Sequence, residues 1–193
     1  MRLFVAITPP ALALDELEAA VAPLRIAQPE LRWSSPQSWH VTLAFLGDVD
    51  DAVTAPLAAR LKRAAARHAR LDLSAAGAGA FPSAPKASVL WTGVQGDRQA
   101  LRAIAVSVAA GARLAGAPSP DEGRRFRPHI TLARCRAPTD VRPLIARLAD
   151  YAGSSWPAGR IHLIRSHPDP QPWYESIGSW PLRARPLSTQ DAA

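Results

Sequence analysis

The chain has 193 residues, of which 48% are hydrophobic, and it carries a formal net charge of +7. This length suits one domain, or two small lobes that share a core. The single cysteine, Cys135, excludes an intrachain disulfide and a thiolate metal cluster. All but two of the 23 basic residues are arginine, whose planar guanidinium fits phosphate, so the composition favours a polyanionic partner.

The N-terminal apolar run is too short for a signal peptide or a membrane span. It covers Leu3–Ile7 and is cut short by Pro9 and Pro10. No later stretch reaches the roughly 18 apolar residues that a transmembrane helix needs. We therefore expect a soluble, cytoplasmic protein with no membrane partner.

Short strands and amphipathic helices alternate along the chain, separated by frequent prolines and glycines. Strands are expected over residues 2–8, 32–34, 40–46, 71–75, 88–94, 129–132, 156–164 and 173–182. Helices are expected over residues 11–26, 52–70, 97–114 and 141–151, the last capped by Thr139. Residues 77–82 are expected to form a loop. The mixture of helices and hairpins favours the α+β class.

One short pattern occurs twice, and it is the most informative feature of the sequence. His40-Val-Thr-Leu-Ala is repeated 89 residues further on as His129-Ile-Thr-Leu-Ala. Because side chains alternate along a strand, each histidine shares a face with the threonine two residues later. A single copy of this pattern is usually structural. Two copies predict a pseudo-two-fold arrangement in which both His-Thr pairs face one cleft.

Two imidazoles facing one cleft are suited to acid–base catalysis, because histidine exchanges protons near neutral pH. One neutral ring accepts a proton from water while the other, protonated, donates to a leaving oxygen. The threonine hydroxyls of Thr42 and Thr131 would hold phosphoryl oxygens. A catalytic metal is not expected, because no carboxylate or further histidine has ligand spacing near either pair.

The chain resembles the RNA 2′,3′-cyclic phosphodiesterases, also called 2′-5′ RNA ligases, of the two-histidine (2H) phosphoesterase superfamily. The resemblance extends from Met1 to about Leu182. It is carried, in order, by Arg2-Leu-Phe-Val-Ala-Ile, Arg32-Trp33, His40-Val-Thr-Leu-Ala-Phe-Leu-Gly, Val89-Leu-Trp-Thr-Gly-Val, Phe126-Arg-Pro-His-Ile-Thr-Leu-Ala-Arg134 and the region of Tyr174.

The resemblance implies a two-lobed fold in which two antiparallel β-sheets face a central cleft and the helices pack outside. It implies one such domain over residues 1–186, with residues 187–193 expected to form a flexible tail. It also implies hydrolysis of an RNA-terminal 2′,3′-cyclic phosphate to a 2′-phosphate, without a cofactor. We expect RNA ends or cyclic-phosphate nucleotides as partners, no obligatory protein partner, and a monomer.

The resemblance assigns His40 as the proton donor and His129 as the acceptor, with Thr42, Thr131 and Arg134 binding the phosphate. Strict strand alternation puts Arg134 on the face opposite His129, so it reaches the cleft only through a bulge, a twist or the end of the strand. The same alternation puts Cys135 on the His129 face.

Some details of the site stay open at this level. Trp39 replaces the smaller aliphatic residue usual in that family before the first motif, a change expected to affect the rim of the cleft but not the chemistry. Trp33 and Phe126 are candidates either for stacking on a base or for the core. His162 and His167 are expected to be non-catalytic, because neither belongs to a repeated pattern.

Three alternatives to hydrolysis of an RNA end also stay open. The same site chemistry would serve 2′-5′ RNA ligation or cleavage of a small cyclic nucleotide. The third alternative is a protein that only binds RNA ends, with its histidines as hydrogen-bond donors.

Overall fold

The computed structural model describes residues 1–120, 123–167 and 173–184. In these residues nine strands form one antiparallel sheet in the order β7-β4-β5-β6-β3-β1-β8-β9, and β2 pairs with β6. The strands are β1 (Arg2–Ile7), β2 (Arg32–Trp33), β3 (Val41–Asp48), β4 (Leu71–Phe81), β5 (Ala87–Gly96), β6 (His129–Thr139), β7 (Trp156–Ala158), β8 (Arg160–His167) and β9 (Trp173–Pro181). The helices are α1 (Ala11–Ala27), α2 (Asp51–Ala65), α3 (Arg98–Leu114) and α4 (Arg142–Arg147), with short 3-10 turns at Pro36–Ser38 and Ala84–Lys86.

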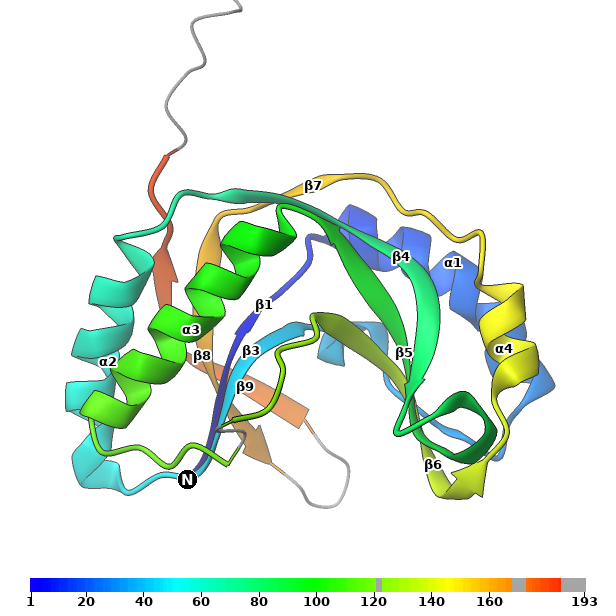
Figure 1. The fold of residues 1–193 in the computed structure, drawn as a ribbon, viewed down its shortest axis with the longest axis horizontal. Coiled ribbons are helices and arrows are strands. Elements are labelled where there is room, and N and C mark those ends of the chain that lie inside the picture. Colours follow the sequence, from blue (N-terminus) through cyan, green and yellow to red (C-terminus); the bar gives the residue numbers. More distant parts are fainter. Residues whose placement is uncertain (121–122, 168–172, 185–193) are drawn as a thin grey trace, which may run out of the picture.

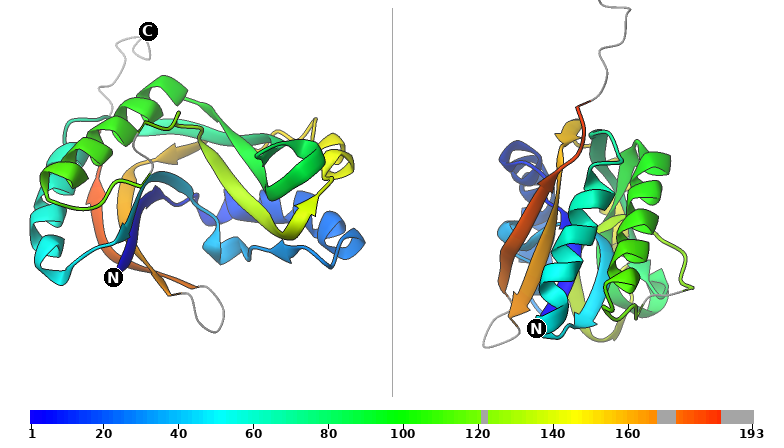
Figure 2. Two further views of the ribbon diagram at one scale, coloured as in Figure 1. Left: turned by 60° about the horizontal axis from the view of Figure 1, so that its bottom comes forward. Right: turned by 90° about the vertical axis from the view of Figure 1, so that its left-hand side faces the viewer.

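The sheet consists of two halves that meet between β3 and β6. These two strands pair through one residue pair, Val41 with Ile130. On one side follow β1, β8 and β9; on the other follow β5, β4 and β7. The sheet therefore curls into an arch (Figure 1 and Figure 2, left), with α2 and α3 against one half and α1 and α4 against the other. This arrangement confirms the predicted α+β, two-lobed fold, but the two expected sheets are joined into one by the pairing of β3 with β6.

Alternation along β1 separates the main core from the concave face of the arch. Leu3, Val5 and Ile7 join the core cluster that also contains side chains of α2 and α3. Phe4 and Ala6 belong to a second, smaller cluster with Ile164 of β8, on the opposite face of the strand. The residues that alternate with the core positions therefore form the floor of the concave side.

Several predicted boundaries are wrong, each for a local reason. The expected loop at 77–82 is mostly strand, because β4 continues to pair with β5 as far as Phe81. Helix α2 ends at Ala65 because residues 66–68 form tight turns that lead into β4. The fourth helix ends at Arg147 rather than at 151. Thr139 ends β6 and donates its hydroxyl to the carbonyl of Ala137, so it caps no helix. The tail expected at 187–193 lies outside the described residues.

Gly79 of β4 lies directly under the indole ring of Trp91, so that a Cβ atom there would overlap the ring carbons. Gly79→Ala should lower the free energy of unfolding by about 1–3 kcal/mol, because overpacking forces the ring or the strand to move. Gly159→Ala is the matched control, since no atom lies within 4 Å of a Cβ at that position. Thermal unfolding of the three proteins checks this, and equal stability of the two variants would contradict it.

Candidate active site

The two predicted His-Thr pairs lie together where the halves of the sheet meet. His40 immediately precedes β3 and His129 opens β6. Val41 and Ile130, which pair, are almost completely buried on the core side. Continuing this antiparallel register by one residue each way sets His40 across from Thr131, and Thr42 across from His129. All four polar side chains therefore share the concave face.

Both imidazoles are oriented by the same hydrogen bond. Nδ1 of His40 lies 2.7 Å from the carbonyl oxygen of Ser38, and Nδ1 of His129 lies 2.7 Å from that of Arg127. A carbonyl only accepts, so Nδ1 carries the proton and donates it in each case. Nε2 is then the atom of each ring that is left to accept a proton or, when protonated, to donate one.

Aromatic side chains hold each ring from the side. Tyr174 meets His40 edge-on, with ring centroids 5.2 Å apart and an angle of 87°. Phe81 meets His129 in the same way, at 5.0 Å and 83°. Phe4 and Trp91 add tilted contacts to His40 and His129 respectively, at 4.7 Å and 6.1 Å. Each imidazole is therefore fixed by one hydrogen bond and two aromatic rings.

Burial and nearby positive charge favour the neutral form of both rings. Burial lowers the pKa of His40 from 6.5 to about 4; the hydrogen bond to Ser38 opposes this, and the charges of His129 and Arg134 add to it. Burial also lowers the pKa of His129, opposed by the hydrogen bond to Arg127 and reinforced by Arg134. At neutral pH the free protein therefore holds two neutral imidazoles.

A β-bulge brings Arg134 to the histidine side of β6. Thr131 pairs with Trp91 and Ala133 pairs with Leu90, which leaves Leu132 as the extra residue. The bulge shifts the alternation by one, so Arg134 returns to the face of His129 and Thr131. The effect of its charge on the pKa of both histidines places the guanidinium near both rings. Of the three routes by which Arg134 was expected to reach the cleft, it is the bulge that brings it there.

The same shift overturns the expectation for Cys135. Beyond the bulge its side chain is on the opposite face and packs partly buried against the main core.

Trp39 is not at the rim of the cleft, because it is only 1% exposed and belongs to the core. Trp33 and Phe126, the candidates for stacking, are partly buried and likewise pack against the core.

The first motif carries an equivalent bulge, which the sequence analysis missed. Thr42 pairs with Ala6 and Ala44 with Val5, so Leu43 is the extra residue, as Leu132 is in β6. The shift puts Phe45 on the concave face, where it pairs with Phe4 of β1. Its exposed fraction is 44%. Phe45 therefore occupies the position that Arg134 holds in the other half. Aligning the two motifs over six residues instead of five would have pointed to it.

The sequence analysis also missed the aromatic residues around the histidines. Phe4 and Trp91 lie on β1 and β5, the strands next to the motif strands, and Phe81 lies on β4, one strand beyond β5. Within the part of the chain that the structure describes, no group of three or more His, Cys, Asp or Glu residues is arranged to hold a metal ion. Nor does any helix of the described residues have the length and hydropathy to cross a membrane.

Comparison with known sequences gives matches over most of the chain. A family model described as the 2′-5′ RNA ligase superfamily matches residues 13–170. A Geobacillus stearothermophilus protein named RNA 2′,3′-cyclic phosphodiesterase is 32% identical over 155 residues, which cover 80% of this chain and 48% of that protein. A Thermus thermophilus protein of the same name is 30% identical over 191 residues, 95% of this chain and 91% of that protein. The match thus spans about half of the first relative and most of the second.

Solved structures share the fold. A crystal structure of a Thermus thermophilus protein matches with a TM-score of 0.76 at 30% identity, covering 95% of this chain and 99% of that one. Escherichia coli LigT, solved with 3′-AMP, matches with a TM-score of 0.74 at 24% identity, covering 94% and 97%. These likenesses agree with the curled sheet and its flanking helices.

The lowered pKa of His40 predicts a loss of stability in acid. The unfolded chain binds a proton at this residue near pH 6.5, whereas the folded chain binds it only near pH 4. The contribution to the free energy of unfolding is therefore complete above pH 6.5 and is lost as the pH falls toward 4. His40→Asn, which keeps an N–H donor for Ser38, should lose less stability than the wild type between pH 7 and pH 4.5. Urea unfolding at both pH values measures this, and equal losses would contradict it.

Proposed function

The chain belongs to the 2′-5′ RNA ligase superfamily, and on that basis we propose that it hydrolyses an RNA-terminal 2′,3′-cyclic phosphate to a 2′-phosphate. The observation that carries this proposal is the matched pair of imidazoles, each with a hydrogen-bonded Nδ1 and a threonine beside it. The name shared by the relatives from Geobacillus and Thermus agrees with it.

The reaction needs one proton acceptor and one proton donor. In the roles that the family resemblance implies, Nε2 of His129 takes a proton from water as the water oxygen bonds to phosphorus. The bond from phosphorus to O3′ breaks, and Nε2 of His40 gives its proton to that oxygen. The products are a 2′-phosphate and a free 3′-hydroxyl. Each proton transfer of this kind contributes about 10²–10⁴-fold in rate.

The remaining polar residues act on the charge of the phosphoryl group. The hydroxyls of Thr42 and Thr131 are on the same face as the histidines and would donate to the non-bridging oxygens. The guanidinium of Arg134 would offset the negative charge that grows in the transition state. Phe45, at the equivalent position of the first motif, carries no charge. The positive charge that faces the phosphate is therefore that of Arg134, in the His129 half.

The substrate itself has a part in preparing the acid. Both imidazoles are neutral in the free protein, so His40 must gain a proton before it can donate one. A phosphate monoanion bound between the rings favours the charged form and raises the pKa of the imidazoles. Binding of the cyclic phosphate is thus coupled to proton uptake.

Ligation is the second candidate, favoured by the description of the family model. If the 5′-hydroxyl of another RNA takes the place of water, the same proton transfers yield a 2′-5′ linkage. Cleavage of a small cyclic nucleotide would use the same residues.

We propose that the protein works without a metal, a cofactor or an obligatory protein partner. Both His-Thr pairs come from one chain, so a monomer contains the complete set of reacting groups. A cytoplasmic location stays a prediction from the sequence.

An oligonucleotide ending in a 2′,3′-cyclic phosphate should be converted to the 2′-phosphate in the presence of EDTA and without added nucleotide triphosphate. His40→Ala and His129→Ala should each lower kcat at least about 100-fold, because each removes a proton-transfer group. The double variant should lose less than the product of the two single losses, because the two groups act in one step. Product analysis by chromatography measures this.

Three results would contradict the proposal. Full activity in either single variant would rule out paired histidine catalysis. Strict dependence on a divalent ion would rule out the metal-independent reaction. Tight binding of the oligonucleotide with no turnover would indicate a protein that only binds RNA ends.

A further inference from the structure

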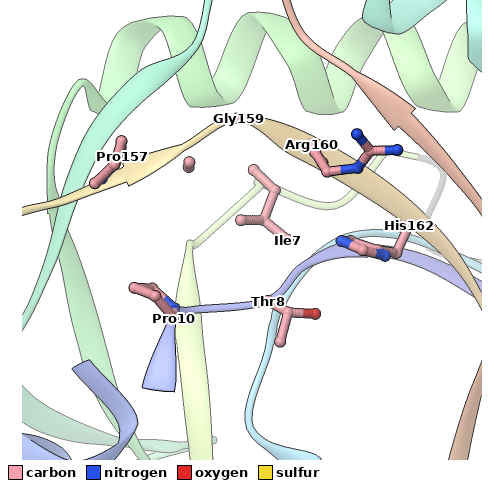
Figure 3. A pocket seen from close by; sticks show the side chains of 8 residues that line it. Ile7, Thr8, Pro10, Pro157, Gly159, Arg160 and His162 are labelled. Carbon is pink, nitrogen blue, oxygen red and sulfur yellow. The ribbon is translucent and has the colours of Figure 1, made fainter. Parts of the chain in front are cut away.

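A cavity with three polar side chains lies at the end of β1 and the start of β8, on the His40 side of the proposed active site. Its volume is about 170 Å³. It is lined by Ile7, Thr8, Pro10, Pro157, Ala158, Gly159, Arg160 and His162. Figure 3 shows Arg160 and His162 on one side of this space and Pro10 and Pro157 on the other, with Thr8 between.

The strand register connects this cavity to the catalytic pair. Thr42 pairs with Ala6 of β1, and Ala6 pairs with His162 of β8. Residues directly opposite each other in antiparallel strands share a face, so His162 is on the concave face, two strands away from Thr42. At about 4.8 Å per strand, the separation is roughly 10 Å. Between them Ala6, which is fully buried beside Phe4 and Ile164, presents only a methyl group on this face.

Thr8 completes the connection. Ile7 pairs with Val41, so the next residues in the antiparallel register, Thr8 and His40, are neighbours across the two strands. Thr8 is exposed and also lines the cavity. A ligand bound to His40 and Thr42 therefore passes Thr8 when it extends toward Arg160 and His162.

The polar groups of the cavity are oriented by hydrogen bonds and suit the binding of an anion. Nε of Arg160 donates to the hydroxyl of Ser179 at 2.8 Å, which leaves its two terminal nitrogens available. Nδ1 of His162 lies 3.2 Å from the hydroxyl of Ser176. Burial, and then the charge of Arg160, lower the pKa of His162, so the guanidinium is close to the ring. None of the eight lining residues is acidic.

The other half of the sheet has no such polar row at the corresponding positions. There His129 pairs with Gly93, and Thr131 pairs with Trp91, whose ring covers Gly79. Trp91 thus puts a large indole ring at the position that Ala6 holds in the first half. The strand next to each motif therefore presents Thr8 beside His40 but Gly93 beside His129.

We propose that this cavity binds a second phosphate of the substrate, the one on the 5′-oxygen of the nucleotide that carries the cyclic phosphate. The proposal rests on the proposed function, because it takes the cyclic phosphate to be bound between His40 and His129. In RNA this second phosphate is the linking diester, and in a free nucleotide it is a 5′-monoester. The Arg160 guanidinium supplies the charge and Thr8 a hydroxyl donor. His162 donates from Nε2 in its protonated form, which a bound phosphate anion favours.

The test compares three substrates: a nucleoside 2′,3′-cyclic phosphate, the same compound with a 5′-phosphate, and a dinucleotide ending in the cyclic phosphate. The wild type should show a kcat/KM about tenfold higher for a substrate with the second phosphate, through a lower KM, as expected for charge-assisted hydrogen bonds. Arg160→Gln should bring this ratio close to one, and His162→Asn should reduce it. Arg165→Gln is the control, because Arg165 is on the same strand but on the opposite face.

The outcomes separate the two proposals. If none of the three compounds is hydrolysed, the proposed function fails. If all are hydrolysed with equal kcat/KM, or if the preference persists in Arg160→Gln, the cavity is not a phosphate site. A gain for the dinucleotide, with or without a gain for the 5′-phosphate, shows that the cavity accepts the linking diester of RNA. A gain for the 5′-phosphate alone identifies a free nucleotide. Either gain, lost in Arg160→Gln and kept in Arg165→Gln, supports the cavity as the second phosphate site.

Discussion

The pairing of Val41 with Ile130 is the contact on which the arrangement of the site depends. It joins two halves of a sheet that otherwise have separate strands and separate covering helices. Because these two residues face the core, their neighbours in sequence must face the concave side. That alternation brings an imidazole and a hydroxyl from each half to the same place. A shift of the pairing by one residue would turn all four polar side chains into the core.

The two halves of the site have nearly the same backbone but different side chains, and this difference gives each half its own role. Both motifs have the hydrogen bond from Nδ1, the edge-on aromatic ring and the bulge after the threonine. They differ in the sixth residue, which is Phe45 in one and Arg134 in the other. They differ again one strand further out, where Ala6 pairs with Thr42 and Trp91 pairs with Thr131. A nearly symmetric fold thus gives a site whose two sides differ, with Arg134 on one side and the exposed Thr8 on the other.

The sequence was sufficient to predict the repeated strands, the face that His40 and His129 share with their threonines, and the α+β class, because these follow from local periodicity. It was not sufficient for features that depend on pairing between distant strands. The bulges at Leu43 and Leu132 arise from pairing with β1 and β5, so strict alternation misplaced Cys135 and left Arg134 dependent on a bulge. The burial of Trp39 in the core was not predicted, because it depends on how distant segments pack around this residue. Local sequence does not encode that packing.

The central claim is that two imidazoles act as acid and base in one step, and the pH dependence of kcat/KM tests it most directly. The account predicts a bell-shaped profile whose maximum lies below the usual histidine pKa of 6.5, because burial and Arg134 lower both values in the free protein. The two limbs belong to the pair as macroscopic values. Removing His129 should flatten the acid limb, and removing His40 should flatten the alkaline limb. A profile that stays flat from about pH 4 to about pH 9 while chemistry limits the rate would contradict paired histidine catalysis.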